Sequence, residues 1–180
     1  GDFVYSPLEW EAMRRDVETC VRVGCDGVVI GALTAQGTVD VEGCRSLVEA
    51  AGPLGVTFHR AFDCVANRAE ALEQAVALGC ERILTSGGAD TALQGAPVIA
   101  ADIRRAAGRL RLLAGAGLTA DNIAAAVQAT GACEFHASAK ALQAGWGPAG
   151  PAGLASAYWR TDVALVRQLR QRLDACMCEG

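Results

Sequence analysis

The sequence lacks long apolar runs and basic runs, and it contains one lysine and two histidines among 180 residues. A membrane-spanning helix needs roughly 18 consecutive apolar residues, and no stretch of that length occurs, so no membrane association is expected. The formal net charge is -4 and the basic residues are not clustered, which disfavours a nucleic-acid-binding surface. These absences leave a small molecule or a metal ion as the expected ligand.

A disulfide framework is not expected either, although cysteine is abundant. The eight cysteines are scattered, several of them end helices, and no secretory signal precedes them. We therefore expect a reducing, cytoplasmic compartment in which most thiols pack as small apolar groups. The cysteines are Cys20, Cys25, Cys44, Cys64, Cys80, Cys133, Cys176 and Cys178.

The composition favours a single domain over residues 1–180 with buried parallel strands. The chain is 52% hydrophobic, has 21 glycines and has a mean hydropathy of +0.24. A short apolar strand followed by a helix recurs at intervals of 24–28 residues. The strands are expected at 27–33, 56–63, 82–87, 110–117 and 134–140. This repeat indicates an α/β fold, either a TIM-type (β/α) barrel or a doubly wound sheet. We predict a partial barrel of five parallel strands, each followed by a helix.

Helix-capping signals separate these strands. Ser6 and Glu9 have the spacing of a capping box at the start of a helix that Gly24 ends. Further helices are expected at 40–51, 67–79, 96–108, 119–131 and from about 162 onwards. The expected N-caps are Asp40, Asn67, Thr119 and, for the last helix, Thr161 or Asp162. The glycine- and proline-rich segment 145–153 is predicted to be a loop.

The segment 56–63, with the sequence VTFHRAFD, carries three ionisable side chains at the end of a strand. Since side chains alternate along a strand, His59 and Asp63 are expected on one side and Arg60 on the other. Asp63 is then expected to orient His59, to bind a substrate hydroxyl, or to cap or anchor a loop. Arg60 either binds a phosphate or carboxylate or, on strict alternation, forms a structural salt bridge beneath the helices.

The carboxyl ends of parallel barrel strands meet at one mouth, where barrel enzymes place their active sites. His59 and His136 are the two histidines, and each lies near such an end. We predict catalytic roles for His59, Asp63 and His136, with the imidazoles as acid and base. The alternative is that each histidine is a hydrogen-bonded core residue without a catalytic role. Lys140 shares a strand face with His136, so Schiff-base chemistry is a further, weaker alternative.

Small and hydroxyl-bearing residues at the same strand ends are predicted to bind substrate. Gly115 and Gly117 precede a helix N-terminus, where anions bind well, and Ser138 lies on the next strand. Close packing of a helix also requires small residues, so the glycines alone leave both interpretations open. The predicted binding residues are Arg60, Thr85, Ser86, Gly115, Gly117 and Ser138.

Four short motifs together carry a family resemblance. They are GDFVYS at 1–6, TFHRAFD at 57–63, ILTSG at 83–87 and EFHAS at 134–138. With these motifs the chain resembles the copper homeostasis protein CutC family from Gly1 to Lys140. The resemblance implies a cytoplasmic TIM barrel in which the first motif follows the third strand. We therefore expect this chain to lack the first three βα units, and the open strand edge to favour a homodimer.

The resemblance implies copper homeostasis, with Cu(I) bound through cysteines in some members. Those cysteines belong to the N-terminal units, and here only Cys176 and Cys178 are closely spaced, so the metal ligands stay undetermined. The alternative is a barrel lyase, isomerase or hydrolase acting on a small phosphorylated or hydroxylated metabolite, with His59 and His136 as acid and base. A third expectation is that the chain has no activity without the strands it lacks.

Overall fold

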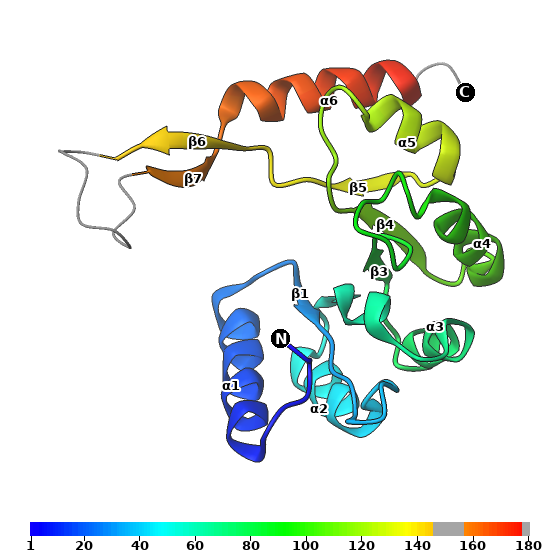
Figure 1. Cartoon of the computed structure of the whole chain (residues 1–180). Coiled ribbons are helices and arrows are strands. Elements are labelled where there is room, and N and C mark those ends of the chain that lie inside the picture. The colour runs from blue at the N-terminus through cyan, green and yellow to red at the C-terminus, as the bar shows by residue number, and fades with distance from the viewer. Residues whose placement is uncertain (146–156, 178–180) are drawn as a thin grey trace.

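The computed structural model describes residues 1–145 and 157–177, and within them five parallel strands form one curved sheet (Figure 1). The strands are β1 (Gly27–Ile30), β2 (Gly55–Phe58), β3 (Arg82–Thr85), β4 (Arg111–Gly115) and β5 (Glu134–His136). Their spatial order follows the chain, β1-β2-β3-β4-β5, and every pairing is parallel. A doubly wound sheet would reverse its order at a switch point. The sequential order therefore confirms the barrel-type α/β fold.

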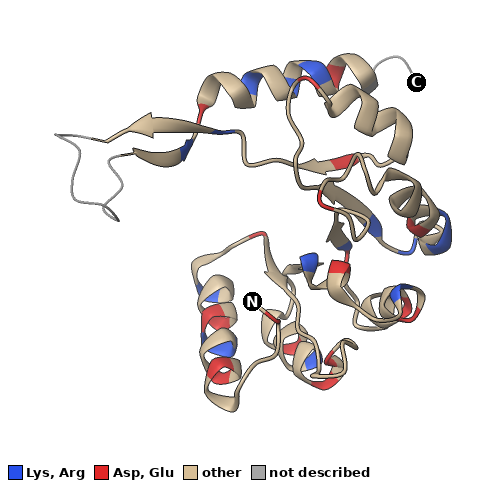
Figure 2. Cartoon of the chain, in the orientation of Figure 1, with Lys and Arg blue, Asp and Glu red and all other residues tan. Residues whose placement is uncertain are grey.

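Helices cover one face of this sheet. They are α1 (Pro7–Val23), α2 (Val41–Ala51), α3 (Arg68–Ala77), α4 (Ala96–Ala106), α5 (Ile123–Thr130) and α6 (Val163–Met177). The capping box of Ser6 and Glu9 forms as predicted, and Gly24 ends α1 with a left-handed φ of 79°. The exposed side of α1 carries alternating charges (Figure 2), paired as Arg14 with Glu11 and Glu18.

The predicted start of α5 at Thr119 is wrong, because Asn122 takes the N-cap position instead. Its side-chain oxygen accepts a hydrogen bond from the Thr119 amide at 2.8 Å, and its side-chain nitrogen donates to the Gly117 carbonyl at 2.8 Å. These two bonds hold residues 117–121 in a turn. The turn lies at the carboxyl end of β4, the end of the sheet at which barrel proteins have their sites.

The strand predicted at 56–63 ends at Phe58, and a 3-10 helix, η1 (Arg60–Cys64), follows it. His59 caps this helix, since its Nδ1 atom accepts a hydrogen bond from the Ala61 amide at 3.2 Å. Strand alternation therefore does not govern residues 59–63. The predicted shared face of His59 and Asp63 is wrong for this reason, and so is the outward direction predicted for Arg60.

The fifth strand is not followed directly by a helix. Within the described residues β6 (Lys140–Ala144) and β7 (Ala157–Thr161) pair antiparallel, and this hairpin projects away from the sheet before α6 begins (Figure 1). The strand predicted to run to Lys140 stops at His136, and Ala139 has a left-handed φ of 44°. Of the loop predicted at 145–153, all but Gly145 lies outside the described residues.

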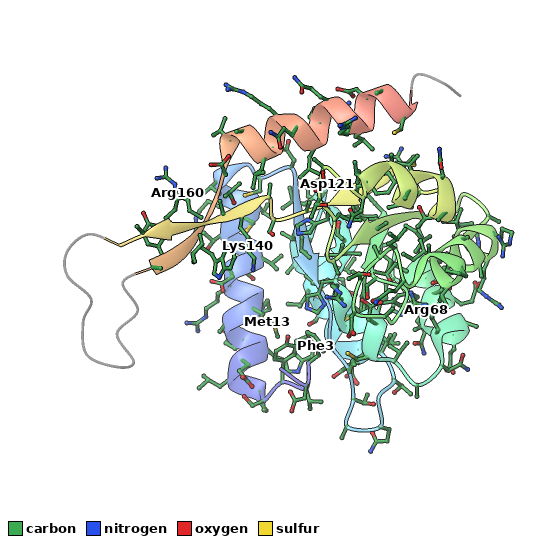
Figure 3. The ribbon with its side chains drawn as sticks, turned by 45° about the horizontal axis from the view of Figure 1, so that its top comes forward. Phe3, Met13, Arg68, Asp121, Lys140 and Arg160 are labelled. Carbon is green, nitrogen blue, oxygen red and sulfur yellow. The ribbon has the colours of Figure 1, made fainter. Side chains whose placement is uncertain are left out.

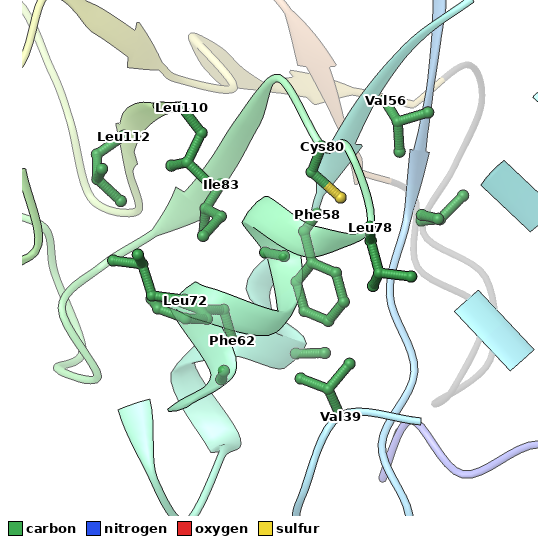
Figure 4. Packing of buried hydrophobic residues seen from close by; sticks show 14 of the residues in the cluster. Val39, Val56, Phe58, Phe62, Leu72, Leu78, Cys80, Ile83, Leu110 and Leu112 are labelled. Carbon is green, nitrogen blue, oxygen red and sulfur yellow. The ribbon is translucent and has the colours of Figure 1, made fainter. Parts of the chain in front are cut away.

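The core lies between the sheet and the helices that cover it. Phe58, Phe62, Leu72 and Ile83 are fully buried and gather in one cluster (Figure 4). Burying each such side chain stabilises the fold by about 1.5–3 kcal/mol. Phe62 belongs to η1, so its burial fixes the 3-10 helix against α3 and positions the polar residues on either side of it. In the part of the chain that is described, no helix is long and apolar enough to cross a membrane.

Candidate functional site

A cavity of about 740 Å³ lies at the carboxyl ends of β4 and β5 and extends under α6. Sites of barrel proteins lie at this end of the sheet. The cavity brings Arg60, His136 and Lys140 together with the carboxylate of Asp121. Lys140 and Asp121 are labelled in Figure 3. Its other polar side chains are those of Thr119, Ser138 and Gln168, and Gly117 also lines it.

Asp63 lies beside this cavity at the centre of a hydrogen-bond network. Its side chain is 6% exposed and forms an ion pair with Arg60 Nε at 2.8 Å. The Thr85 hydroxyl donates to it at 2.5 Å, and the Ser86 and Gly88 amides donate at 3.0 Å each. Burial alone raises the pKa of this carboxyl, but the hydrogen bonds from Thr85, Arg60, Ser86 and Gly88 together hold its pKa below the usual value. Asp63 therefore remains charged and joins η1 to the loop after β3.

Arg68 extends the network to the helix layer. Its Nε donates to Asp102 at 2.7 Å, its Nη2 donates to the Thr85 hydroxyl at 2.5 Å, and its guanidinium lies 4.2 Å from the centre of the Phe62 ring. Burial raises the pKa of Asp102, and the charge of Arg68 opposes that shift. The network is thus a set of mutually satisfied groups beneath the cavity.

Thr85 and Ser86, both predicted to bind substrate, belong to this network and not to the cavity lining. Both are fully buried. The Thr85 hydroxyl donates to Asp63 while accepting from the Gly87 amide at 2.8 Å, and the Ser86 hydroxyl accepts from Arg60 Nη2 at 2.8 Å. Thr85 and Ser86 therefore hold Asp63 and Arg60 in position, and neither of them lines the cavity.

Arg60 lines the cavity, contrary to the outward direction that strand alternation predicted. Its Nε is bound by Asp63 and its Nη2 donates to Ser86. The side chain is nevertheless 43% exposed. A guanidinium that is fixed along one edge and exposed along another is prepared to bind an anion.

The turns after β4 and β5 carry unusual backbone angles where they line the cavity. Ala116 has a φ of 95° and Ala139 a φ of 44°, in the region that side chains other than glycine rarely adopt. Such angles cost of order 1–3 kcal/mol each and cluster at functional sites. Gly117, with a φ of 66°, lines the cavity as predicted, whereas Gly115 is buried. A Cβ atom at Gly115 would lie 2.6 Å from a methyl group of Leu84, so close packing explains that glycine.

The two histidines lie in different cavities. His136 is exposed in the cavity described above, together with Ser138. His59 lies in a second groove of about 460 Å³ between α1 and β1, with its ring centre 5.1 Å from that of Phe3. Burial lowers the pKa of His59 because it disfavours the imidazolium. The predicted acid–base pairing of His59 with His136 is therefore not formed, and Asp63 orients Arg60 instead of His59.

Several cavity residues did not belong to the predicted set. Lys140 lines the cavity, but not from the strand face predicted to carry it together with His136, because β5 stops at His136 and Lys140 begins β6; its Nζ lies 5.0 Å from the centre of the Trp159 ring. Asp121 follows the glycine turn by a few residues, a signal that could have identified it. Gln168 comes from α6, and no local pattern connects it with the sheet.

The described thiols offer little to a metal ion that needs several ligands. Among residues 1–145 and 157–177, no three His, Cys, Asp or Glu side chains are placed to hold a metal. Burial raises the pKa of Cys44 to about 12 and that of Cys80 to about 11, so both stay protonated. Cys178, half of the predicted close pair with Cys176, lies outside the described residues. Cys20 and Cys25 are a second pair of neighbouring thiols, less buried than Cys44 and Cys80.

The fold and this site define a class, namely barrel-type α/β proteins with a polar cavity at the carboxyl ends of the strands. A family model described as the CutC family matches residues 1–141. The family protein CutC of Xanthomonas campestris pv. campestris strain B100 is 54% identical over 177 residues, which cover 97% of this chain and 74% of that protein. The family protein CutC of Pasteurella multocida strain Pm70 is 39% identical over 181 residues. The chain belongs to the CutC family.

Solved structures agree with this assignment. The structure of a protein from Streptococcus agalactiae, named as a candidate copper homeostasis protein CutC, is 33% identical with a TM-score of 0.72. The match covers 76% of this chain and 67% of that one. A structure named native KDPGal reaches a TM-score of 0.52 at 16% identity over 92% of this chain, a likeness that shows the fold alone.

Proposed function

We propose that the cavity at the carboxyl ends of β4 and β5 binds a small anionic metabolite, and that the protein acts on it as a lyase, isomerase or hydrolase. The observation that carries this proposal is the convergence of Arg60, His136 and Lys140 on one cavity of about 740 Å³. Three groups that carry or accept a proton, beside a serine hydroxyl, favour a phosphate or carboxylate over a neutral ligand.

Each cavity residue has a role that its contacts support. Asp63 and Ser86 fix Arg60 by its Nε and Nη2 atoms, so its remaining N–H groups are free among the described residues to donate to an anion. Asp121 repels the anion from its own side of the cavity and can accept a hydrogen bond from a substrate hydroxyl. His136 lies exposed in the cavity, where its imidazole can transfer a proton to or from a bound substrate.

Calorimetric titration with phosphate esters and hydroxy acids of three to six carbons tests the proposal. We expect binding that weakens with salt, and that weakens about tenfold in Lys140→Ala because one charged hydrogen bond is lost. Arg104→Ala, which removes an exposed arginine from α4, is the matched control and leaves binding unchanged. His136→Gln keeps binding and loses turnover. Equal affinity in the wild type and in Lys140→Ala would contradict the proposed site.

We also propose Cu(I) binding in the cytoplasm as a second candidate function, because the related Streptococcus agalactiae protein is named for copper homeostasis. Soft thiolates select Cu(I), and the described cysteines are all free. The test supplies Cu(I) to the reduced protein with a competing chelator, removes the unbound ion, and measures copper per chain. A protein that retains no copper under these conditions excludes the candidate.

A further inference from the structure

The junction between α1 and β1 has a backbone arrangement that places two cysteines side by side. Gly24 adopts a left-handed conformation, its amide donates to the Val21 carbonyl at 3.2 Å, and the Cys25 amide donates to the Cys20 carbonyl at 3.0 Å. This pair of hydrogen bonds is a Schellman motif, in which the side chains at the positions of Cys20 and Cys25 frequently come into contact. The backbone therefore favours a contact between the two thiols.

The two thiols interact and are within reach of solvent. Partial burial raises the pKa of Cys25, and the neighbouring Cys20 thiol raises it further. Both side chains are partly exposed, and Cys20 also lines the groove between α1 and β1. An ion can therefore reach both sulfur atoms without unfolding the helix end.

The junction between α3 and β3 has the same backbone and only one sulfur. There the Gly79 amide donates to the Val76 carbonyl and the Cys80 amide donates to the Ala75 carbonyl, each at 3.0 Å. Ala75 stands where Cys20 stands in the first junction, and Cys80 is buried. The chain thus shows that alanine fits the Cys20 position in this motif, which supplies a conservative test substitution.

We propose that Cys20 and Cys25 form a two-thiolate site for a soft, two-coordinate d10 cation such as Cu(I) or Ag(I). The inference rests on the copper candidate above and gives that candidate a location. On binding, two S–H bonds break, two metal–sulfur bonds form and two protons leave, so no oxidant or reductant is needed. The carbonyl groups at the end of α1 carry partial negative charge, which favours a bound cation. Zn(II) requires four ligands and is not satisfied by this pair.

The test titrates the full reduced chain with Ag(I) and, separately, with Cu(I) under anaerobic conditions, each against a chelator that removes weakly held metal. We expect one retained equivalent in the wild type and in Cys64→Ser, which removes an exposed single thiol. Cys20→Ala and Cys25→Ser should each lose that equivalent. Circular dichroism verifies that both variants fold, and the arrangement at Ala75 and Cys80 indicates that Cys20→Ala does. Zn(II) should not be retained.

The outcomes separate the site from the function it rests on. If the wild type retains one equivalent and both variants also retain it, the Cys20–Cys25 site is overturned while Cu(I) binding stands. If the wild type retains none, both the site and the copper candidate are overturned. Retention of Zn(II) as tight as that of Ag(I) also overturns the two-coordinate site, because more ligands must then be present.

Discussion

Replacing Asp63 with asparagine preserves the shape of the side chain and removes the charge that pairs with Arg60 and Arg68. The Asp63 side chain is 6% exposed, so water replaces little of the lost interaction. Removing one partner of a buried ion pair costs about 3–5 kcal/mol. The Arg60 side chain is 43% exposed and regains water, which reduces the penalty for its unpaired charge. We therefore expect Asp63→Asn to lower the free energy of unfolding by about 3 kcal/mol, the lower end of that range.

Urea unfolding followed by circular dichroism measures this loss. The midpoint should fall while the slope stays unchanged, because the same surface is exposed on unfolding. For a domain of this size, about 3 kcal/mol corresponds to a fall in Tm of roughly 6–12 °C. Arg104→Ala, on the exposed side of α4, is the control and should change stability by less than about 0.5 kcal/mol. A loss below about 1 kcal/mol in Asp63→Asn would refute the network reasoning.

The wild type and Asp63→Asn should also differ in how their free energy of unfolding depends on pH. The folded-state pKa of Asp63 lies below the unfolded value of about 3.9, so its ionised form stabilises the native state above that value. This stabilisation is lost as the pH falls through the folded pKa. Burial shifts the pKa of Asp102 the other way in both proteins; the charge of Asp63 adds to that shift only in the wild type, and by less than burial does. The stability difference between wild type and Asp63→Asn should therefore shrink below about pH 4.

Three further predictions concern the fold around the site. Asn122→Ala removes both 2.8 Å hydrogen bonds of the turn before α5. We expect urea unfolding to show a loss of about 1–2 kcal/mol in the free energy of unfolding, and calorimetry to show weaker anion binding. Unchanged binding would contradict the turn's role. Phe62→Ala leaves a cavity at a fully buried position and should lower the free energy of unfolding by about 3–5 kcal/mol in the same assay. A loss under about 2 kcal/mol would mean that neighbouring side chains repack into the cavity. Val29, 63% exposed on the edge strand β1, should favour self-association, so Val29→Lys should lower the sedimentation-derived mass without changing Tm, and an unchanged mass would exclude this edge as the contact.

Local signals in the sequence were sufficient for the alternation of strands and helices. The capping box at Ser6 and the glycine at position 24 depend on residues within a few positions of one another, and both form as predicted. The regular repeat fits a barrel and a doubly wound sheet alike, so the sequential strand order could not be predicted from the repeat alone. The hairpin of β6 and β7 escaped prediction because most of its residues are exposed, so no alternation of apolar and polar residues marks it.

The end of β2 shows where local patterns fail. Apolar and polar residues alternate over 56–59, which favours a strand that continues past Phe58, yet the chain turns into η1 at Arg60. The cause is non-local: the Asp63 carboxylate accepts hydrogen bonds from the hydroxyl of Thr85, the last residue of β3, and from the amide of Ser86, both more than twenty positions away. A strand conformation would place that carboxylate elsewhere and leave those donors unpaired, which costs about 1–3 kcal/mol for each buried group.

The difference between local and non-local contacts also explains which site residues could be predicted. The convergence of Gly117, His136 and Ser138 requires only that parallel strands end together, and the cavity contains all three. The roles of Thr85 and Ser86 depend on which polar groups satisfy one another once buried, and their spacing in the chain does not contain that information. Arg60 connects the two sets: the buried network fixes one side of its guanidinium, and the cavity receives the other. A substitution in the network should therefore weaken ligand binding through Arg60, even though Asp63 touches no ligand. Loss of stability without loss of binding in Asp63→Asn would show that the two sets are independent.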